Sequence, residues 1–597
     1  MLDNIWPLAG IVALSAATLV LGIWGARRAR TTSDFLVARQ SVREQRNAAA
    51  ISGEYLSAAS FLGIAGLVLK DGVDALWFPI GFAGGYLALM LFVAAPLRRS
   101  GAYALPDFAE ARLDSLPLRW LSTVLVVLVG WLYLVPQLQA AGRMITLVGN
   151  VPYRTCIAVV GGVLLVTVLS GGIRAVTLVQ AFQYWVKLFA ITLPAFVLLM
   201  VFLVAHPGAQ QGLNTPRPAV FDHGTTVRID ADVRLRFTRP VWLVAHGAEE
   251  DDAPSQPDLG SGEVYVQPGE YSVPSGAALD FPAGSPVPVV SDAKPDNATW
   301  LNPQQSGGSG LLRTYSIMLA TFLGTMGLPH VLVRFYTNPS GYRVRRTILF
   351  VLALLGTFYL FPTVFGMLSR LYVPQLLVTG RTDMAVLELP QAMLGNWVGG
   401  LLAAVTAAGA FAAFLSTSSG LVVSVASVLT SDVFKGKVRS VRAVSVVATV
   451  LPALLALQVS DEDISLSVGM AFALAASTFA PMLVLGVWWR GLTAVGAACG
   501  MLSGGSLVVA ARVVTAVWNL PTSGLTDLIK QPALVSVPIA FLVTVLVSRA
   551  TRNRVPASVP QVMLRMHAPD RLGFMDESTV PAAPPVRSGG KHHADDG

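Results

Sequence analysis

The stretch that decides the fold reads Asn47-Ala-Ala-Ala-Ile-Ser-Gly-Glu-Tyr-Leu-Ser-Ala-Ala-Ser-Phe-Leu-Gly63. It is apolar enough to cross a membrane, yet Ser52 and Gly53 weaken a helix and Glu54 places a carboxylate at mid-depth. A second apolar run, Gly324-Thr-Met-Gly-Leu-Pro-His330, is interrupted by Gly and by Pro, which lacks a backbone donor. Two interrupted runs five spans apart predict an inverted-repeat transporter with its site near the membrane midplane.

The composition of the whole chain indicates a membrane protein. Of its 597 residues, 54% are hydrophobic and only 13% are charged, whereas soluble domains carry about 25% charged residues. The net charge of +8 does not indicate a nucleic-acid partner, because the basic residues lie in short loops between apolar runs. Cys156 and Cys499 fall inside apolar runs, which predicts two buried thiols. The lipid bilayer is therefore the first expected partner.

Apolar windows of about 20 residues predict thirteen spans. The first lacks a basic leader segment and is interpreted as a retained helix instead of a signal peptide. The predicted spans are 5–26, 47–69, 73–97, 119–149, 153–170, 174–205, 311–336, 346–370, 396–433, 439–458, 464–489, 492–516 and 532–548.

The loops between these spans predict an orientation. Arginines and lysines follow the first, third, seventh, ninth and last spans, all on one side, as in Arg27, Arg98, Arg343, Lys435 and Arg549. The other side receives Asp461-Glu-Asp463 and one long polar loop. The positive-inside rule then predicts an outside N-terminus and a cytoplasmic C-terminus in the cell (plasma) membrane.

Residues 206–310 and the end of the chain have a different composition. The first region is rich in Pro, Gly and Asp, and 226–237 alternates polar and apolar residues as a strand does, with 263–266 as another candidate strand. We interpret it as a small β-rich extracytoplasmic insertion, with a poorly ordered loop as the alternative. The polar, Pro-rich stretch 555–597 predicts a disordered cytoplasmic tail.

The ninth span contains four successive hydroxyl side chains, Ser416-Thr-Ser-Ser419. Hydroxyls and free carbonyls are the oxygens that suit a monovalent cation. Alternatively, such hydroxyls bond the carbonyls of their own helix.

At this point the chain resembles the sodium/solute symporter family. The resemblance rests on 51–63, on Gly324–Phe335, on Ala475-Ala-Ser-Thr-Phe-Ala-Pro481 and on the thirteen-span layout. Within the family the chain is similar to the cation/acetate symporters and related monocarboxylate permeases. The resemblance implies an all-α LeuT-type fold of two inverted five-helix repeats. The divisions it implies are an extra helix and loop in 1–46, repeats in 47–205 and 311–489 separated by the insertion 206–310, two C-terminal helices in 490–554, and the tail 555–597.

The resemblance also implies a sodium site. Carbonyls of Ala48, Ile51 and Ala413 and the hydroxyls of Ser416 and Thr417 match the family's positions and carry suitable oxygen atoms. Sodium is the expected coupling ion, with no other cofactor. Sugar and proline carriers of the family have an Asp in the sixth span, two positions after a Trp. This chain has Leu178 and Gln180 there instead, which argues against the sugar branch, resembles the acetate branch and leaves the cation stoichiometry open.

Other residues are assigned to the solute site or to a buried ion pair. Glu54 and Lys187 are ionisable residues inside spans, so each is a functional candidate and the two are expected to pair. The alternative is that Lys187 extends to a membrane interface while Glu54 accepts from backbone amides. The residues expected around the solute are Ser52, Glu54, Trp77, Tyr133, Gln137 and Thr325.

The predicted function is sodium-coupled symport of a small monocarboxylate, such as acetate, propionate or pyruvate, by alternating access. An anion entering a negative-inside cell works against about 2.3 kcal/mol per charge per 100 mV, which one cation cancels. The alternatives are another organic solute on the same fold, proton coupling through Glu54, and a membrane sensor. The sequence predicts no enzyme, since it holds no nucleophile elbow, P-loop or His/Cys metal spacing. It leaves the oligomeric state open.

Overall fold

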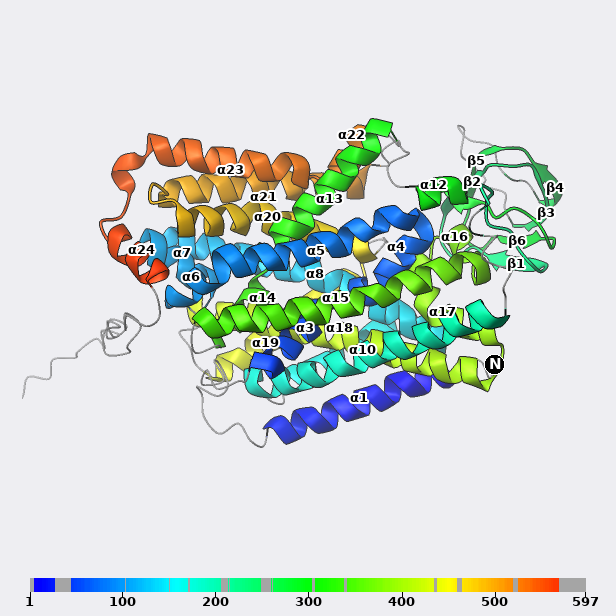
Figure 1. Ribbon diagram of the computed structural model, residues 1–597, viewed down its shortest axis with the longest axis horizontal. Helices are drawn as coiled ribbons and strands as arrows, with labels where there is room; N and C mark the ends of the chain where they lie inside the picture. The colour runs from blue at the N-terminus through cyan, green and yellow to red at the C-terminus, as the bar shows by residue number, and fades with distance from the viewer. Residues whose placement is uncertain are drawn as a thin grey trace, which may run out of the picture.

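A computed structural model of the chain describes most of its residues and is mainly helical (Figure 1). The described residues are 5–26, 44–102, 104–149, 151–169, 172–205, 213, 215–247, 259, 261–302, 307–337, 341–433, 438–458, 464–518 and 524–568. The predictions for Arg27, Lys435, 461–463 and the end of the tail lie outside these ranges.

The helices of the first half of the chain pack side by side along one common direction (Figure 1). They are α1 (Ile5–Ala26), α3 (Glu44–Tyr55), η2 (Ala59–Gly63), α4 (Ile64–Asp71), η3 (Gly72–Leu76), α5 (Trp77–Ala88), η4 (Leu89–Val93), α6 (Ala94–Arg99), α7 (Leu105–Leu113), α8 (Leu116–Gly149), α9 (Tyr153–Leu169) and α10 (Gly172–Ala205).

The second half begins after the β-rich region. Its helices are α12 (Asn297–Leu301), α13 (Gly307–Gly327), α14 (Pro329–Val333), η5 (Arg334–Thr337), α15 (Gly341–Tyr372), α16 (Leu376–Thr379), η6 (Thr382–Met384), α17 (Ala385–Leu394), α18 (Trp397–Asp432), α19 (Val438–Ala456), α20 (Ile464–Trp488), α21 (Ala494–Val517), α22 (Gly524–Lys530), α23 (Ala533–Ala550), η7 (Arg552–Arg554) and α24 (Val559–His567).

Ten segments of the described chain are long and apolar enough to cross a membrane. One of them, Ala59–Arg99, covers the end of the predicted span 47–69 and all of 73–97. The chain turns back between the two at Gly72, whose φ of 65° favours glycine. Tyr153–Leu169 and Arg442–Ala456 are shorter apolar helices. When Ala59–Arg99 is counted as two spans and both shorter helices are added, the described residues contain thirteen spans, the number predicted.

Both predicted helix interruptions occur, but by different means. In the second, α13 ends at Gly327, Leu328 is extended, and Pro329 starts α14. In the first, Ser52 and Gly53 remain inside α3, and the interruption follows at Leu56 and Ser57. A Cβ on Gly53 would meet the backbone oxygen of Gln180, so this glycine permits close packing of α3 on α10.

The insertion is β-rich, as predicted. One sheet has the order β1-β6-β3-β4 and the other β5-β2-β7, and every pair is antiparallel. The strands are β1 (Thr225–Arg228), β2 (Val233–Phe237), β3 (Val241–His246), β4 (Gly262–Val266), β5 (Gly269–Val273), β6 (Ala278–Phe281) and β7 (Val289–Val290). The single strand predicted over 226–237 is wrong. Ile229 instead bonds Ala277 and Gly276, and the chain passes from one sheet to the other.

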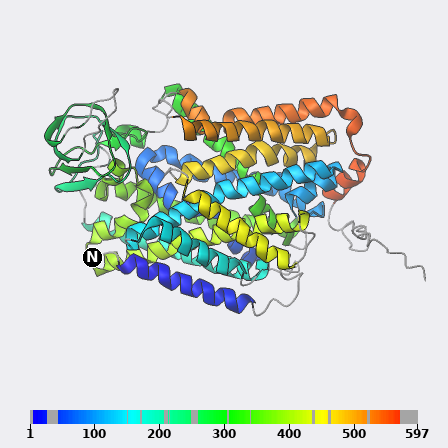
Figure 2. The ribbon, with the colours of Figure 1, turned by 180° about the vertical axis from the view of Figure 1, so that it is seen from behind.

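The insertion is tied to the turn between α4 and α5. Lys70 Nζ pairs with Asp292 Oδ2 at 2.5 Å, and Trp300 Nε1 donates to the carbonyl of Val68 at 2.7 Å. The insertion and the start of α1 lie at the same end of the bundle, and α24 lies at the other (Figures 1 and 2). This arrangement agrees with the predicted separation of the two termini, while the side that faces the cytoplasm remains a prediction.

The expectation of disorder from residue 555 onward does not hold for 559–567, which form α24. Its apolar residues recur at helical spacing, and Val559, Met563 and Met566 are buried. The helix packs against α6 and α7, so burial of this stripe orders the start of the tail.

Candidate cation and solute site

The first helix interruption leaves carbonyl oxygens of α3 without the usual helical partners. Two of these carbonyls meet the hydroxyl run on α18. Ser416 Oγ donates to the carbonyl of Gly53 at 2.6 Å, and Thr417 Oγ1 donates to the carbonyl of Glu54 at 2.5 Å. The hydroxyls thus join α3 to α18 at the interruption.

The side chain of Lys187, from α10, reaches the same point. Its Nζ donates to the carbonyls of Gly53 and Leu56, the latter at 2.7 Å, and to Ser416 Oγ at 2.8 Å. Lys187 has no exposed surface. The three donors of an ammonium group therefore each find a buried oxygen, and Lys187 does not extend to an interface.

The predicted cation ligands come from two helices, α3 and α18, which meet at the first interruption. Ser416 Oγ lies 3.2 Å from the carbonyl oxygen of Ala413, and Ser416 and Thr417 both face α3, as expected. Ala48 and Ile51 are buried in α3 but lie before the interruption. The carbonyls that meet α18 or Lys187 belong to Gly53 and Glu54 of α3 and to Leu56, which directly follows α3.

Glu54 and Lys187 do not pair with each other in the structure. Glu54 Oε2 instead accepts from Arg334 Nε at 2.8 Å, and both side chains are at most 4% exposed. Arg334 belongs to η5, just after the second interruption, so this ion pair joins the two broken helices. Sequence reasoning missed Arg334, although its charge next to an interrupted span was a usable signal.

Gln180 connects this ion pair to the hydroxyl run. Arg334 donates through Nη2 to Gln180 Oε1 and through Nη1 to Thr177 Oγ1 at 2.6 Å. Gln180 Nε2 in turn donates to the carbonyl of Ser416 at 2.9 Å. Gln180 thus satisfies both the guanidinium of Arg334 and a carbonyl of α18.

Gln137, expected near the solute, binds the other side of the interruption. Its Oε1 accepts from the freed amide of Ala58 at 3.1 Å. Its Nε2 has no partner among the described residues, and the side chain is fully buried. Tyr55 and Thr325, the latter also expected at the site, share a hydrogen bond of 2.8 Å.

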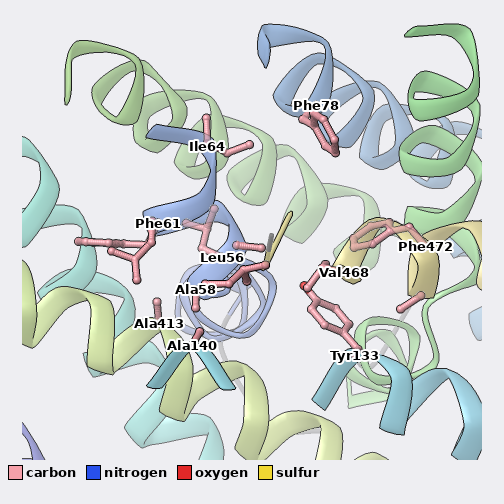
Figure 3. Close-up of a cluster of buried hydrophobic side chains, with 14 of the residues drawn as sticks. Leu56, Ala58, Phe61, Ile64, Phe78, Tyr133, Ala140, Ala413, Val468 and Phe472 are labelled. Carbon is pink, nitrogen blue, oxygen red and sulfur yellow. The ribbon is translucent and has the colours of Figure 1, made fainter. Parts of the chain in front are cut away.

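Aromatic rings from four helices, α3, α5, α8 and α20, pack against one another next to the first interruption. Ring centroids are 4.7 Å apart for Tyr55 and Tyr86, 5.0 Å for Phe82 and Phe472, and 5.8 Å for Tyr133 and Phe472. Figure 3 draws Tyr133 and Phe472 within the same buried cluster as Leu56 and Ala58 of the interrupted helix. The hydroxyl of Tyr86 has no partner within the described residues.

The two remaining residues expected around the solute, Trp77 and Ser52, are not part of this aromatic cluster. Trp77 lines a separate cavity of about 250 Å³, together with Asp71, Asp292 and Arg313, between the α4–α5 turn and the insertion. Ser52 is buried in α3, and its hydroxyl has no partner in the described part of the chain. No group of three His, Cys, Asp or Glu that could hold a metal occurs among the described residues.

Comparison with known proteins gives the same fold. The chain matches the Sodium:solute symporter family over residues 35–223 and 288–504, and the gap between them falls in the insertion. It is 27% identical over 551 residues to an uncharacterized symporter, YwcA, of Bacillus subtilis (strain 168), covering 89% of this chain and 91% of that protein.

The chain is also similar to solved structures. The structure of a Na⁺-coupled sialic acid symporter in its substrate-bound outward-open state matches with a TM-score of 0.56 and 14% identity, covering 91% of this chain and 98% of that one. The nucleobase-cation-symport transporter Mhp1 matches with a TM-score of 0.47 and 10% identity, over 89% and 98%. The predicted helical symporter fold is confirmed.

Proposed function

Because the chain belongs to the sodium:solute symporter family, we propose that this multi-pass secondary active transporter carries a small monocarboxylate, such as acetate, propionate or pyruvate. The solute binds at the first helix interruption and is moved together with a cation by alternating access. The N-terminus lies outside the cell membrane and the C-terminus in the cytoplasm, as the basic loops predict.

The observation that carries this proposal is the environment of Gln137. Its Oε1 binds the Ala58 amide at the start of the second half-helix, where aligned peptide dipoles favour an anion. Its buried Nε2 is left as a donor with no partner among the described residues. Leu56, at the interruption, and Phe472 belong to the same buried apolar cluster (Figure 3). One donor group beside apolar walls suits a solute with one carboxylate and a short hydrocarbon part.

The buried charges favour an anionic solute as well. The Glu54 carboxylate is paired with Arg334, and within the described residues the Lys187 ammonium is held by neutral oxygens. The three groups together leave one positive charge in the core. A buried charge without a counterion is costly, so a carboxylate bound at the interruption would reduce the desolvation cost of that charge.

The expected test is uptake of labelled pyruvate into proteoliposomes by wild type and the Gln137→Leu variant. Loss of a hydrogen bond to a charged group costs about 1.5–3 kcal/mol, which corresponds to a KM higher by roughly 10–100-fold. Gln139→Leu is the matched control, because Gln139 is a buried glutamine of the same helix that reaches Ala456 instead. Its KM should stay within about twofold of wild type.

Two outcomes would contradict the proposal. An unchanged KM in Gln137→Leu would place the solute elsewhere in the protein. Absence of uptake of pyruvate, propionate and acetate by folded wild-type protein would exclude the small monocarboxylates as the solute class, while family membership and fold would stand.

A further inference from the structure

Lys187 stands where a coupling cation would be expected, at the contact between the first helix interruption and the hydroxyl run of α18. We propose that the Lys187 ammonium is the coupling cation of this transporter, so that the chain couples its solute to a proton carried on Lys187 Nζ and not to a sodium ion. The role of Lys187 in the transport cycle rests on the proposed function, whereas the proposal that its ammonium occupies the cation site does not.

The geometry around Nζ is that of a small cation site. Two backbone carbonyls, of Gly53 and Leu56, and the hydroxyl of Ser416 surround it, and the carbonyl of Leu56 lies 2.7 Å away. Carbonyl and hydroxyl oxygens are also the ligands that a sodium ion would use. The oxygens are therefore already engaged, and a sodium ion at the same place would lie beside a like charge in a medium of low dielectric.

The position in the fold makes this contact suitable for coupling. The carbonyls come from the end of α3 and the interruption after it, the hydroxyl from α18 and the lysine from α10, so the ammonium joins three helices at one point. Loss of the proton leaves an amine with two donors for these oxygens, which weakens the contact between the interrupted helix and α18. Protonation of Lys187 is thereby linked to the packing of the helices that enclose the solute.

The charged groups that face Lys187 leave its charge unbalanced. Glu54 of α3 is the neighbouring carboxylate, and it is bound to Arg334. The described part of α1 carries no titratable side chain, and that of α18 has only Asp432, which pairs with Arg119. The ionisable residues of α9 lie at the end of that helix, and so do those of α15 except Tyr359, whose hydroxyl bonds Ser60. Glu388 of α17 is exposed.

The proton balance of one cycle follows from this arrangement. The neutral amine takes up one proton from the outside, and the ammonium then accompanies one carboxylate anion, so the loaded site has no added net charge. On the inside the ammonium returns the proton to water, and the carboxylate leaves as the anion. One proton and one monocarboxylate move together, and no covalent bond to the solute forms or breaks.

The first experiment measures occupancy of the site without any solute. Thermal unfolding of the purified full-length protein is followed in sodium chloride and in choline chloride at equal ionic strength, for wild type, Lys187→Ala and, as control, Lys530→Gln, an exposed lysine. We expect wild type and Lys530→Gln to be indifferent to sodium. Lys187→Ala should be stabilised by sodium in a concentration-dependent way, because its oxygens are released.

Two results would overturn the assignment: sodium stabilises the wild type as much as Lys187→Ala, or it stabilises neither protein. Should Lys187→Ala fail to fold, the wild type itself decides, measured between about pH 6 and about pH 10, a range that approaches the ordinary titration range of lysine. A sodium effect that emerges only at high pH supports the assignment, and one already present at low pH, or absent throughout, overturns it.

The second experiment measures coupling, with labelled pyruvate in proteoliposomes and protein-free liposomes as the blank. Wild type should accumulate pyruvate with an inward proton gradient in sodium-free buffer, and an added sodium gradient should change the rate by less than twofold. Lys187→Ala should lose proton-driven accumulation but retain pyruvate exchange. Accumulation that requires sodium would overturn the proposal. Absence of pyruvate transport in every variant would instead count against the proposed solute, and the unfolding result would still decide the place of Lys187.

Discussion

The two interrupted helices of the molecule occupy corresponding places in its two halves, yet they are stabilised in different ways. At Leu328 the local sequence is sufficient, because Pro329 supplies no backbone donor and readily starts a new helix. At Leu56 and Ser57 the chain contains no proline, and the freed groups are bound by Ser416, Lys187 and Gln137 from other helices. The first interruption is thus a product of tertiary contacts, and its partners include the groups assigned to the cation and the solute.

The largest effect is expected where the two interruptions are joined. Arg334→Met leaves the Glu54 carboxylate buried without its partner, and removal of one member of a buried pair costs about 3–5 kcal/mol. We expect a large loss of thermal stability and poor recovery of folded protein. Size-exclusion chromatography after heating measures the fraction of protein that stays folded.

The matched variant for that pair is Arg334→Met combined with Glu54→Gln, which removes both charges. Recovery of part of the lost stability in the double variant would show that the cost lies in the uncompensated carboxylate. Equal stability of wild type and Arg334→Met would mean that the pair does not join the two interrupted helices.

A smaller effect is expected for a single hydroxyl at the first interruption. Thr417→Val keeps the shape of the side chain but removes the hydrogen bond to the carbonyl of Glu54, leaving a buried acceptor at a cost of about 1–3 kcal/mol. Thr406→Val on the same helix is the control, because the Thr406 hydroxyl bonds a carbonyl of its own helix, that of Ala403. The midpoints of thermal unfolding of the two variants give the comparison, and a Thr406 variant as unstable as the Thr417 variant would contradict it.

The smallest effect is expected at the second interruption. Pro329→Ala retains a residue compatible with a helix start, so the stability should fall by less than about 1 kcal/mol, mainly through greater freedom of the unfolded chain. Its thermal unfolding midpoint should therefore lie close to that of wild type and above that of Thr417→Val. The reverse order would show that the second interruption also depends on distant contacts.

Several features of the site could be predicted from the sequence because their causes are local. Hydropathy identifies the spans, and Gly327 and Pro329 identify the second interruption. The hydroxyl run at Ser416 identifies the helix that faces the first interruption. Gln137 and Thr325 were expected near the solute. In the structure Gln137 bonds the amide of Ala58, just after the interruption, and Thr325 bonds the hydroxyl of Tyr55, just before it.

Other features could not be predicted, because they depend on how far one helix is shifted and rotated against another. The α3 carbonyls that meet α18 lie a few residues after those expected from the family, and Trp77 lies in a separate cavity near the insertion. A short displacement along a helix exchanges one set of carbonyl oxygens for another, and sequence patterns do not specify it.

The sequence by itself therefore determined a membrane-spanning helical transporter with two interrupted helices and with ionisable residues buried among them. Only the tertiary structure decided the partners of those residues. Glu54 pairs with Arg334, 280 positions away. Lys187 bonds the carbonyls of Gly53 and Leu56 and the hydroxyl of Ser416. The physical reason is that burial of a charge can be read from the surrounding hydropathy, whereas its compensation depends on which atoms the folded chain brings within hydrogen-bonding distance.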